Sequence, residues 1–500
     1  MWALNAEPFC LLQKAVLGRS LLYSEVVVAK MDPARTIAFV SSAIDSSALP
    51  VLLDYVRVPS VSPGFDPAWQ ANGFIQQAQD VLLTWVHSQS VSGLTCELIT
   101  HPNTPPVVYI EVPATTPGLP TVLIYGHMDK QPAFTGWSEF CGPYEPVVRE
   151  GLLYGRGCVD DGYSITSAVL AVKAVQEQGL PLGKVVIVVE NEEESGSDNL
   201  LANLETIKAK TGPVNLIVCL DSGGPDFNRL WVTSSLRGYV EFQLEVKVLD
   251  KGVHSGNSSG IVPSSFRIIT QLLNRVEDQA TGRILLPEMH TKLTAEQHDR
   301  TNALAQFAGD FLYQRFPFVS GAQPMTDDLA ELLLNELLRP TLSVTGASGL
   351  PETSSAGNVL LPFTSLKLSF RTPPGVDENA ALQKAIEVLV SDPPHGAHVT
   401  VLRASAGKGW GLQPLSKWLK AALSSASKAV FGSEEMYCGE GGSIPLMRSL
   451  QDLYPEADFL VTGALGPQSN AHGPDENMNI AFYKNLTACI ALILQAHSSS

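Results

Sequence analysis

The chain has 500 residues and a formal net charge of −17, with 45% apolar and 17% charged residues. That length exceeds what one hydrophobic core usually holds, so two or three domains are expected. The negative charge argues against binding to nucleic acid or to an anionic membrane surface, because both repel an acidic protein. Seven cysteines stand at scattered positions without a CxxC pair, which favours free thiols in a reducing compartment over a disulfide framework.

The first 31 residues are ambiguous as a targeting signal. The apolar run Phe9–Leu12 is followed at once by polar residues, which makes a poor signal-peptide core. No apolar run in the chain reaches the length that we expect of a membrane span. Asp32 and Pro33 have the form of a helix start, with Asp32 as the N-cap and Pro33 in the first turn. We therefore predict that residues 1–31 are an extension ahead of the folded part. We also predict a cytoplasmic protein, with organellar import as the alternative.

The first half of the chain alternates apolar strands with helices. Helices are expected over Pro33–Val56, Gly73–Val91, Ile165–Glu177 and Asn199–Lys210, and strands over Thr95–Ile99, Val107–Val112, Pro120–Tyr125, Gly183–Glu190 and Val214–Leu220. Continuous apolar strands of this kind are typical of sheets that are buried on both faces. The pattern predicts an α/β fold, with a mixed, mostly parallel sheet sandwiched by helices.

Polar residues follow three of these strands at the point where each strand ends. His127 and Asp129 follow the strand that begins at Pro120, Glu190–Glu194 follow the next, and Asp221 follows the third. In open α/β sheets the carboxyl ends of the strands carry the ligands. A histidine and several acids at three such ends therefore predict a functional site at one edge of the sheet.

Two further places offer similar side chains. Asp160 and Asp161 stand at a turn before a helix, where adjacent aspartates suit either helix capping or cation binding. His472 lies in a Gly/Pro loop, where a histidine that is hydrogen-bonded within its loop is the alternative. Together these residues are mixed nitrogen and oxygen ligands, suited to zinc, manganese or cobalt. A pair of such cations needs a bridging carboxylate, and Asp160 is well placed for that task.

After Trp231 the strands change to an alternating, half-exposed pattern. Strands are expected over Tyr239–Val248, Leu366–Arg371 and Val399–Leu402, and helices over Ser264–Val276 and Ala380–Val390. We read these elements as an α+β domain inserted at residues 234–404, with an irregular stretch at 282–356 that packs on it. The first domain, residues 32–233, then resumes over residues 405–500. Its second part holds helices over Pro414–Phe431 and Asn479–Ala496, a strand and glycine-rich turn over Met436–Ser443, and a strand over Phe459–Gly463.

Several separated motifs occur in one order over about residues 45–495. They are Gly126-His127-Met128-Asp129, Leu153–Gly157 with Asp160-Asp161-Gly162, Glu193–Ser197, Asp221-Ser222-Gly223, His254-Ser255-Gly256, Phe370-Arg371, Glu440–Pro445 and Ala471-His472. With these motifs the chain resembles the M20 family of dinuclear metallopeptidases, particularly the branch of carnosinase and cytosolic nonspecific dipeptidase. The resemblance implies a catalytic domain made of residues 32–233 and 405–500. It also implies that residues 234–404 form a lid through which the chain makes a homodimer.

The resemblance also implies a ligand set for two divalent metal ions, with zinc expected first and manganese or cobalt as alternatives. His127 and Asp221 would bind one ion, and Glu194 and His472 would bind the other. Asp160 would bridge the two ions.

Further roles follow from the same resemblance. Asp129 would orient His127, and Glu193 would be the general base that activates a water bridging the metals. Four residues would contact the substrate: His254, Asn358, Arg371 and Ser443. Of these, His254 would reach the active site of a partner subunit, and Arg371 would bind a substrate carboxylate.

The resemblance implies a hydrolase that cleaves dipeptides or removes C-terminal residues from short peptides. The alternatives are an N-acyl-amino-acid deacylase of the same family and a non-catalytic binding or scaffold protein. No nucleic-acid or membrane partner is expected. Gly162-Tyr163 stand where the family commonly has Lys, and Gly-Pro-Asp-Glu follow His472 where the dipeptidases differ. These departures leave the ligands and the base in place but bear on the shape of the pocket.

Overall fold

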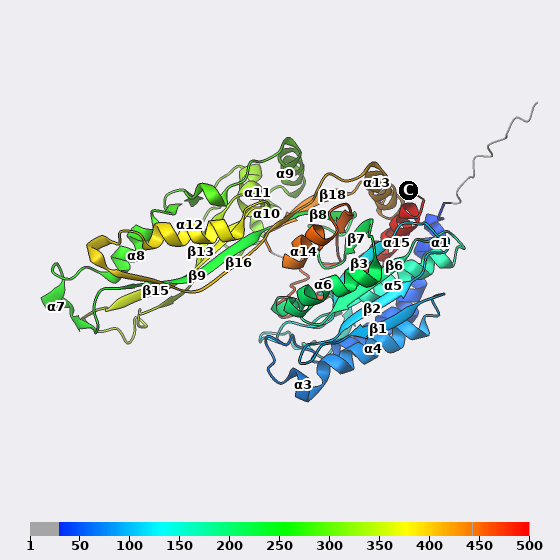
Figure 1. Cartoon of the computed structure of the whole chain (residues 1–500), viewed down its shortest axis with the longest axis horizontal. Coiled ribbons are helices and arrows are strands. Elements are labelled where there is room, and N and C mark those ends of the chain that lie inside the picture. Colours follow the sequence, from blue (N-terminus) through cyan, green and yellow to red (C-terminus); the bar gives the residue numbers. More distant parts are fainter. Residues whose placement is uncertain (1–29, 443, 500) are drawn as a thin grey trace, which may run out of the picture.

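The computed structural model describes residues 30–442 and 444–499. It has a layered α/β lobe and an elongated lobe built on a second sheet (Figure 1). Nearly all of the predicted N-terminal extension lies outside the described residues, and so do Cys10 and Ser443. The remaining cysteines are free thiols, as the scattered spacing predicted.

The described chain begins with two helices, α1 (Pro33–Ala43) and α2 (Leu49–Val56), joined by a π-helical turn. The carboxylate of Asp32 accepts hydrogen bonds from the backbone N–H groups of Ala34 and Arg35, so the predicted N-cap is confirmed. By length and composition the 24-residue stretch Pro33–Val56 is long enough to cross a membrane, contrary to our expectation for the chain. In this structure α1 packs on α5 (Tyr163–Gln176) and α15 (Ile480–His497), and α2 packs on α4 (Phe74–Ser88).

The α/β lobe is organised by a six-stranded sheet in the order β1-β2-β6-β3-β7-β19. The strands are β1 (Thr95–Ile99), β2 (Val107–Val112), β3 (Val122–His127), β6 (Val185–Glu190), β7 (Leu216–Cys219) and β19 (Asp458–Val461). The pairs β6–β3, β3–β7 and β7–β19 are parallel, whereas β1 and β2 form an antiparallel edge. The predicted mixed, mostly parallel sheet is confirmed.

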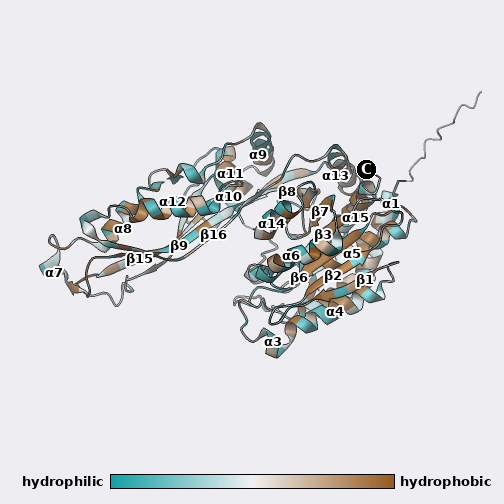
Figure 2. Ribbon diagram, in the orientation of Figure 1, coloured by the Kyte–Doolittle hydropathy of each residue, from teal (hydrophilic) through white to brown (hydrophobic). Residues whose placement is uncertain are grey.

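Helices cover both faces of this sheet because its strands are apolar on both sides. In β3, Val122 and Ile124 face one hydrophobic core, while Leu123 and Tyr125 face another. The first core is closed by α1, α2, α4 (Phe74–Ser88), α5 (Tyr163–Gln176), α13 (Lys417–Phe431) and α15 (Ile480–His497). The second core is closed by α6 (Asp198–Thr211) and α14 (Pro445–Leu453). The strands of this sheet are accordingly brown in Figure 2, whereas β9 (Gly238–Lys247) and β16 (His398–Gly407) of the elongated lobe are paler.

The elongated lobe holds a four-stranded antiparallel sheet in the order β13-β15-β9-β16. These strands are β9 (Gly238–Lys247), β13 (Thr341–Ser348), β15 (Phe363–Thr372) and β16 (His398–Gly407). Alternate residues of β9, such as Phe242 and Leu244, are buried beneath α8 (Ser265–Leu273) and α12 (Glu378–Val390). The residues between them are half-exposed, which is the pattern that alternation in the sequence predicted.

The prediction that residues 282–356 are irregular and pack on the inserted sheet is wrong for most of the stretch. It contains β13 and the helices α9 (Ala295–Ala308), α10 (Phe311–Gln314) and α11 (Leu329–Leu337). The helices build a separate core around Trp231, Leu304 and Leu337, against β8 (Trp231–Leu236) and β18 (Met436–Glu440). Helix α9 has few apolar residues, so its periodicity is weak. Its capping box, Thr294 with Gln297, was the available start signal.

Candidate active site

Strands β6, β3 and β7 are parallel neighbours, so their carboxyl ends lie at the same edge of the sheet. His127 is the last residue of β3, Glu193 and Glu194 lie in the turn after β6, and Asp221 follows β7. Asp160 is contributed by the turn before α5, and the loop before β20 (Asn477–Asn479) contributes His472. Residues from remote parts of the chain therefore converge at one edge.

The structure brings together all five residues that were predicted to hold metal. His127 Nε2 lies 3.0 Å from Asp160 Oδ1 and 3.8 Å from Asp221 Oδ1. His472 Nε2 lies 2.9 Å from Asp160 Oδ2 and 3.1 Å from Glu194 Oε2. The two oxygens of Asp160 thus face two different histidines, which is the arrangement a bridging carboxylate requires. Two groups of possible ligands, His127/Glu193/Asp221 and His127/Asp160/Glu194, each have donor atoms within 4.8 Å of one another.

The electrostatics of this cluster fit a pair of divalent cations. Burial and the charge of Asp221 raise the pKa of the Glu193 carboxyl well above its ordinary value. Burial and Asp160 raise the pKa of Glu194 to about 7. Contacts with Asp160 and Glu194 raise the pKa of His472 to about 11. Carboxylates crowded in a buried site need positive charge, and imidazole and carboxylate donors are the ligands that zinc, manganese and cobalt accept.

Asp129 does more in the structure than orient His127. Its Oδ1 lies 3.4 Å from His127 Nδ1. Its two carboxylate oxygens also accept hydrogen bonds from the backbone N–H groups of Glu193 and Glu194, each at 3.1 Å. Asp129 therefore positions a histidine of one strand end and the acidic turn of the next.

Two residues that sequence reasoning left without a role support the same ligands. Gln131 donates from its backbone N–H and from Nε2 to the two carboxylate oxygens of Glu194, at 3.2 and 2.7 Å. Asp161 Oδ2 accepts a hydrogen bond of 3.1 Å from the backbone N–H of His127. Asp161 thus holds the backbone of β3. For Gln131, the only signal was its place two residues after Asp129.

A buried ion pair joins the two loops that meet at Asp160. Arg156 Nη1 lies 2.6 Å from Glu476 Oε2, and the two side chains are 1% and 0% exposed. Arg156 Nη2 also donates to the Gly473 carbonyl at 2.9 Å, and Gly157 N–H donates to Glu476 Oε1 at 2.9 Å. The loop that carries His472 is therefore tied to the turn that carries Asp160. Sequence reasoning missed Glu476, because a single carboxylate in a loop has no distinguishing pattern.

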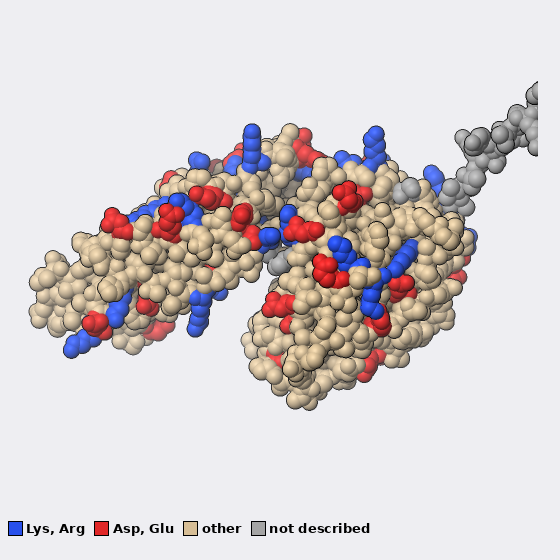
Figure 3. Space-filling model, in the orientation of Figure 1, with Lys and Arg blue, Asp and Glu red and all other residues tan. Residues whose placement is uncertain are grey.

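The cluster opens into a cavity of about 760 Å³ between the two lobes. Figure 3 shows these lobes separated by a notch, with acidic and basic side chains intermixed on the face in view. Arg371, Tyr239 and Glu241 line the cavity from the elongated lobe, and Glu440 and Leu465 line it from the α/β lobe. The volume is in the range of small-molecule sites. Arg371 thus shares a cavity with the cluster, as its predicted role in substrate binding requires.

Two of the other predicted substrate contacts, His254 and Asn358, are not brought to this cavity. His254 and Asn358 are exposed at the far end of the elongated lobe, beside α7 (Ser255–Ser258) in Figure 1. There, strand Val253–His254 pairs with Val359–Leu360, and the Asn358 carbonyl accepts a hydrogen bond from the Ser255 N–H at 2.9 Å. Ser443 lies outside the described residues.

The α/β lobe thus carries a cluster of two histidines and several carboxylates at one edge of its sheet, and this cluster opens into a cavity that the α+β lobe also lines. Residues 123–496 match Peptidase family M20/M25/M40, and the chain belongs to this family. The resemblance that the sequence motifs indicated is thereby confirmed.

Named relatives agree with this assignment. The chain is 26% identical to the cysteinylglycine-S-conjugate dipeptidase of Corynebacterium striatum, over 72% of this chain and 77% of that protein. It is 27% identical to the Beta-Ala-His dipeptidase of Homo sapiens, over 75% of this chain and 74% of that protein. The solved structure of the dipeptidase Dug1p from Saccharomyces cerevisiae has the same fold. Its TM-score is 0.69 at 24% identity, and the match covers 94% of this chain and 99% of that chain.

Proposed function

We propose that this protein is a dinuclear metallopeptidase that cleaves dipeptides or removes C-terminal residues from short peptides. One observation carries the proposal: Asp160 presents one oxygen to His127 and the other to His472, within a cluster that also contains Glu193, Glu194 and Asp221. The dipeptidase names of the relatives support the choice of substrate. We further propose zinc as the metal and the cytoplasm as the location, since the described cysteines are free thiols.

When bound, a pair of divalent cations supplies Lewis acidity that acidifies water and polarises the scissile carbonyl. Residues of the chain transfer the proton and bind the substrate. Glu193 takes a proton from the attacking water and passes it to the leaving nitrogen as the C–N bond breaks. Burial and the charge of Asp221 raise the pKa of the Glu193 carboxyl above its ordinary value, which makes its carboxylate a stronger base. Arg371 binds the free carboxylate of the substrate through its planar guanidinium.

Replacement of the base tests this proposal. We expect Glu193→Ala to retain its metal but to lose about 10²–10⁴ in kcat, the usual contribution of general acid–base catalysis. Glu192→Ala is a matched control, because the Glu192 carboxylate accepts a hydrogen bond from Asn199 and does not line the cavity. Turnover on a dipeptide panel and metal content would be measured for both variants. A fully active Glu193→Ala enzyme would reject the mechanism.

We also propose that residues 234–404 act as a lid and form a homodimer. His254 and Asn358 are exposed and lie away from the cluster of their own chain. In a dimer, these two residues of one subunit would instead reach the cluster of the other subunit. Mixing inactive Glu193→Ala and His254→Ala subunits tests this arrangement. A hybrid dimer would hold one site with both residues intact and would regain activity. A fully active monomer in light scattering would contradict the proposal.

An N-acyl-amino-acid deacylase is the second candidate, because it would use the same cluster and the same Arg371. A panel of dipeptides, tripeptides and N-acyl amino acids, assayed with zinc, manganese and cobalt in turn, separates the two activities. Metal content below one ion per chain, with no hydrolysis across the panel, would instead favour a non-catalytic binding protein.

A further inference from the structure

A second cavity, also of about 760 Å³, adjoins the active-site cavity. Three residues line both cavities: Glu440, Gly442 and Leu465. Gly223 and Gly224, which come directly after Asp221-Ser222, line the second cavity as well. The Glu440 carboxylate also accepts a hydrogen bond from Ser222 Oγ at 2.6 Å. The second cavity therefore begins beside the candidate metal centre.

Three helices contribute apolar side chains to the lining of this cavity, which also includes Gln314 and Gln468. Helices α9, α10 and α11 contribute Leu304, Ala308, Phe311, Leu312, Leu333 and Leu337. Two charged residues that line it, Arg315 and Glu336, lie 2.5 Å apart and neutralise each other. A group that enters past Glu440 thus meets the six apolar side chains of these helices, in a space large enough for an aromatic or long aliphatic chain.

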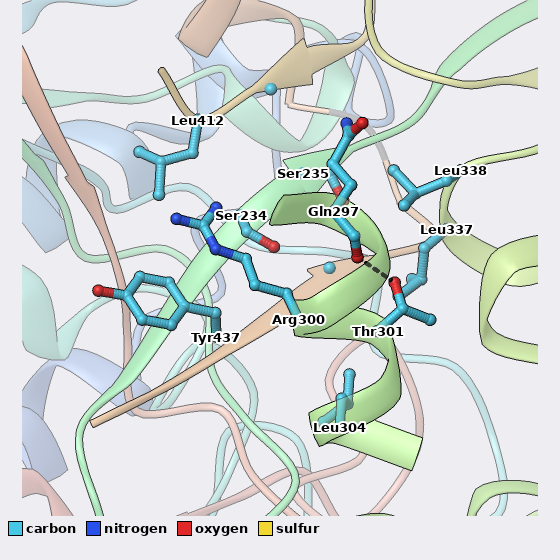
Figure 4. A pocket seen from close by; sticks show the side chains of 12 residues that line it. Ser234, Ser235, Gln297, Arg300, Thr301, Leu304, Leu337, Leu338, Leu412 and Tyr437 are labelled. Carbon is cyan, nitrogen blue, oxygen red and sulfur yellow. Dashed lines mark hydrogen bonds between the residues drawn. The ribbon is translucent and has the colours of Figure 1, made fainter. Parts of the chain in front are cut away.

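A smaller neighbouring pocket shares Leu304 and Leu337 but differs in size (Figure 4). Its walls carry the polar side chains of Gln297, Arg300 and Tyr437, and its volume is about 50 Å³. This pocket is too small for an aromatic or long aliphatic chain. The larger cavity is therefore the one that suits such a group.

The position of Arg371 indicates which end of a substrate points toward the second cavity. Arg371 lines the active-site cavity but not the second one, whereas Glu440 lines both. With the substrate carboxylate at Arg371 and the scissile bond at the cluster, the acyl side extends toward Glu440. We infer that the second cavity binds an apolar group on the acyl side of the scissile bond. This inference rests on the proposed function and selects substrates within it.

A substrate series with a constant C-terminal alanine tests the inference: Gly-Ala, Leu-Ala, Phe-Ala and N-octanoyl-alanine. One methylene group in a hydrophobic pocket changes kcat/KM by about 10–200-fold. Because Leu and Phe add several carbon atoms to Gly, kcat/KM should rise at least about tenfold from Gly-Ala to Leu-Ala or Phe-Ala. Phe-Ala and N-octanoyl-alanine distinguish an apolar side chain from an acyl chain as the source of the group. Equal kcat/KM for Gly-Ala and both apolar classes would overturn the inference.

Two exposed aromatic residues provide a matched pair of variants. Phe311 lines the second cavity and is 50% exposed, whereas Phe316 is 53% exposed and does not line it. We expect Phe311→Asp to lower the ratio of kcat/KM for Phe-Ala over Gly-Ala at least about tenfold, and Phe316→Asp to leave that ratio unchanged. Ala308→Trp, which fills the cavity, should lower the same ratio, whereas Ala303→Trp on the exposed side of α9 should not.

The outcomes separate the inference from the proposed function. An unchanged ratio in both Phe311→Asp and Ala308→Trp, with normal turnover of Gly-Ala, would overturn the inference alone. Absence of hydrolysis for every substrate would refute the proposed function, and the inference with it.

Discussion

Replacement of Arg156 by Met is expected to destabilise the protein strongly. The guanidinium and the Glu476 carboxylate are both buried, so Arg156→Met leaves a carboxylate without its cation inside the protein. Breaking a buried pair from one side costs about 3–5 kcal/mol. The Gly473 carbonyl also loses a donor. Burial already raises the pKa of Glu476 to about 7, and protonation of this carboxyl would limit the loss.

A double-mutant cycle with urea unfolding measures this effect. Arg156→Met together with Glu476→Gln should cost less than Arg156→Met alone, because no buried charge is left unpaired. Arg448→Met is the matched control: its partner Asp452 lies 2.8 Å away, but the side chains are 39% and 49% exposed, so at most about 1 kcal/mol is expected.

The contact between the two loops can also be tested by measuring metal content. Since the pair joins the turn of Asp160 to the loop of His472, Arg156→Met should also lower the metal content of the purified protein. Two results together would refute this reasoning: Arg156→Met lowers the free energy of unfolding by less than about 1 kcal/mol, and the effects of the two single substitutions add in the double variant.

Four further predictions follow from named contacts. Asp160→Asn removes the charge that faces both histidines and should lower metal content and turnover together, as measured by elemental analysis and a dipeptide assay, whereas Asp250→Asn, at a fully exposed side chain, should change neither. Asp129→Asn leaves one buried N–H of the acidic turn without an acceptor, so about 1–3 kcal/mol of stability should be lost in urea unfolding, along with part of kcat. Removal of metal by a chelator should lower Tm, and re-addition should restore it, because bound ions would offset the repulsion among the carboxylates; an unchanged Tm would contradict a resident metal pair. Burial lowers the pKa of His497 from 6.5 to about 4, so the unfolded chain binds more protons between these values and stability should fall as the pH drops through this window, by up to about 3 kcal/mol. His497→Phe should abolish that part of the difference between urea unfolding at pH 7.5 and at pH 4.5.

Local patterns in the chain were sufficient for the main architecture. The apolar runs at Val107–Val112 and Thr95–Ile99 became strands with the predicted bounds, and the alternation after Tyr239 became a sheet with one covered face. These features follow from the period of the side chains along a strand, which any strand shares irrespective of its neighbours. The same reasoning failed where periodicity is weak, as in α9.

Part of the candidate site could likewise be predicted from local sequence patterns, and part of it could not. The positions of His127 and Asp221 followed from apolar strands that end in polar residues, because parallel strands end at a common edge. Which oxygen of Asp160 faces which histidine depends on the path of two remote loops. Those loops are held together by Arg156 and Glu476, and one side chain in each loop gives no local pattern.

The strands, most of the helices that cover them and the kinds of side chain at the strand ends could therefore be predicted from local sequence, since each depends on neighbours within a few residues. Three features depend on the tertiary structure: the double contact of Asp160, the separation of His254 from the cluster of its own chain, and the cavity behind Glu440. Each of these is a distance between residues far apart in the chain, and such distances are set by the packing of whole elements.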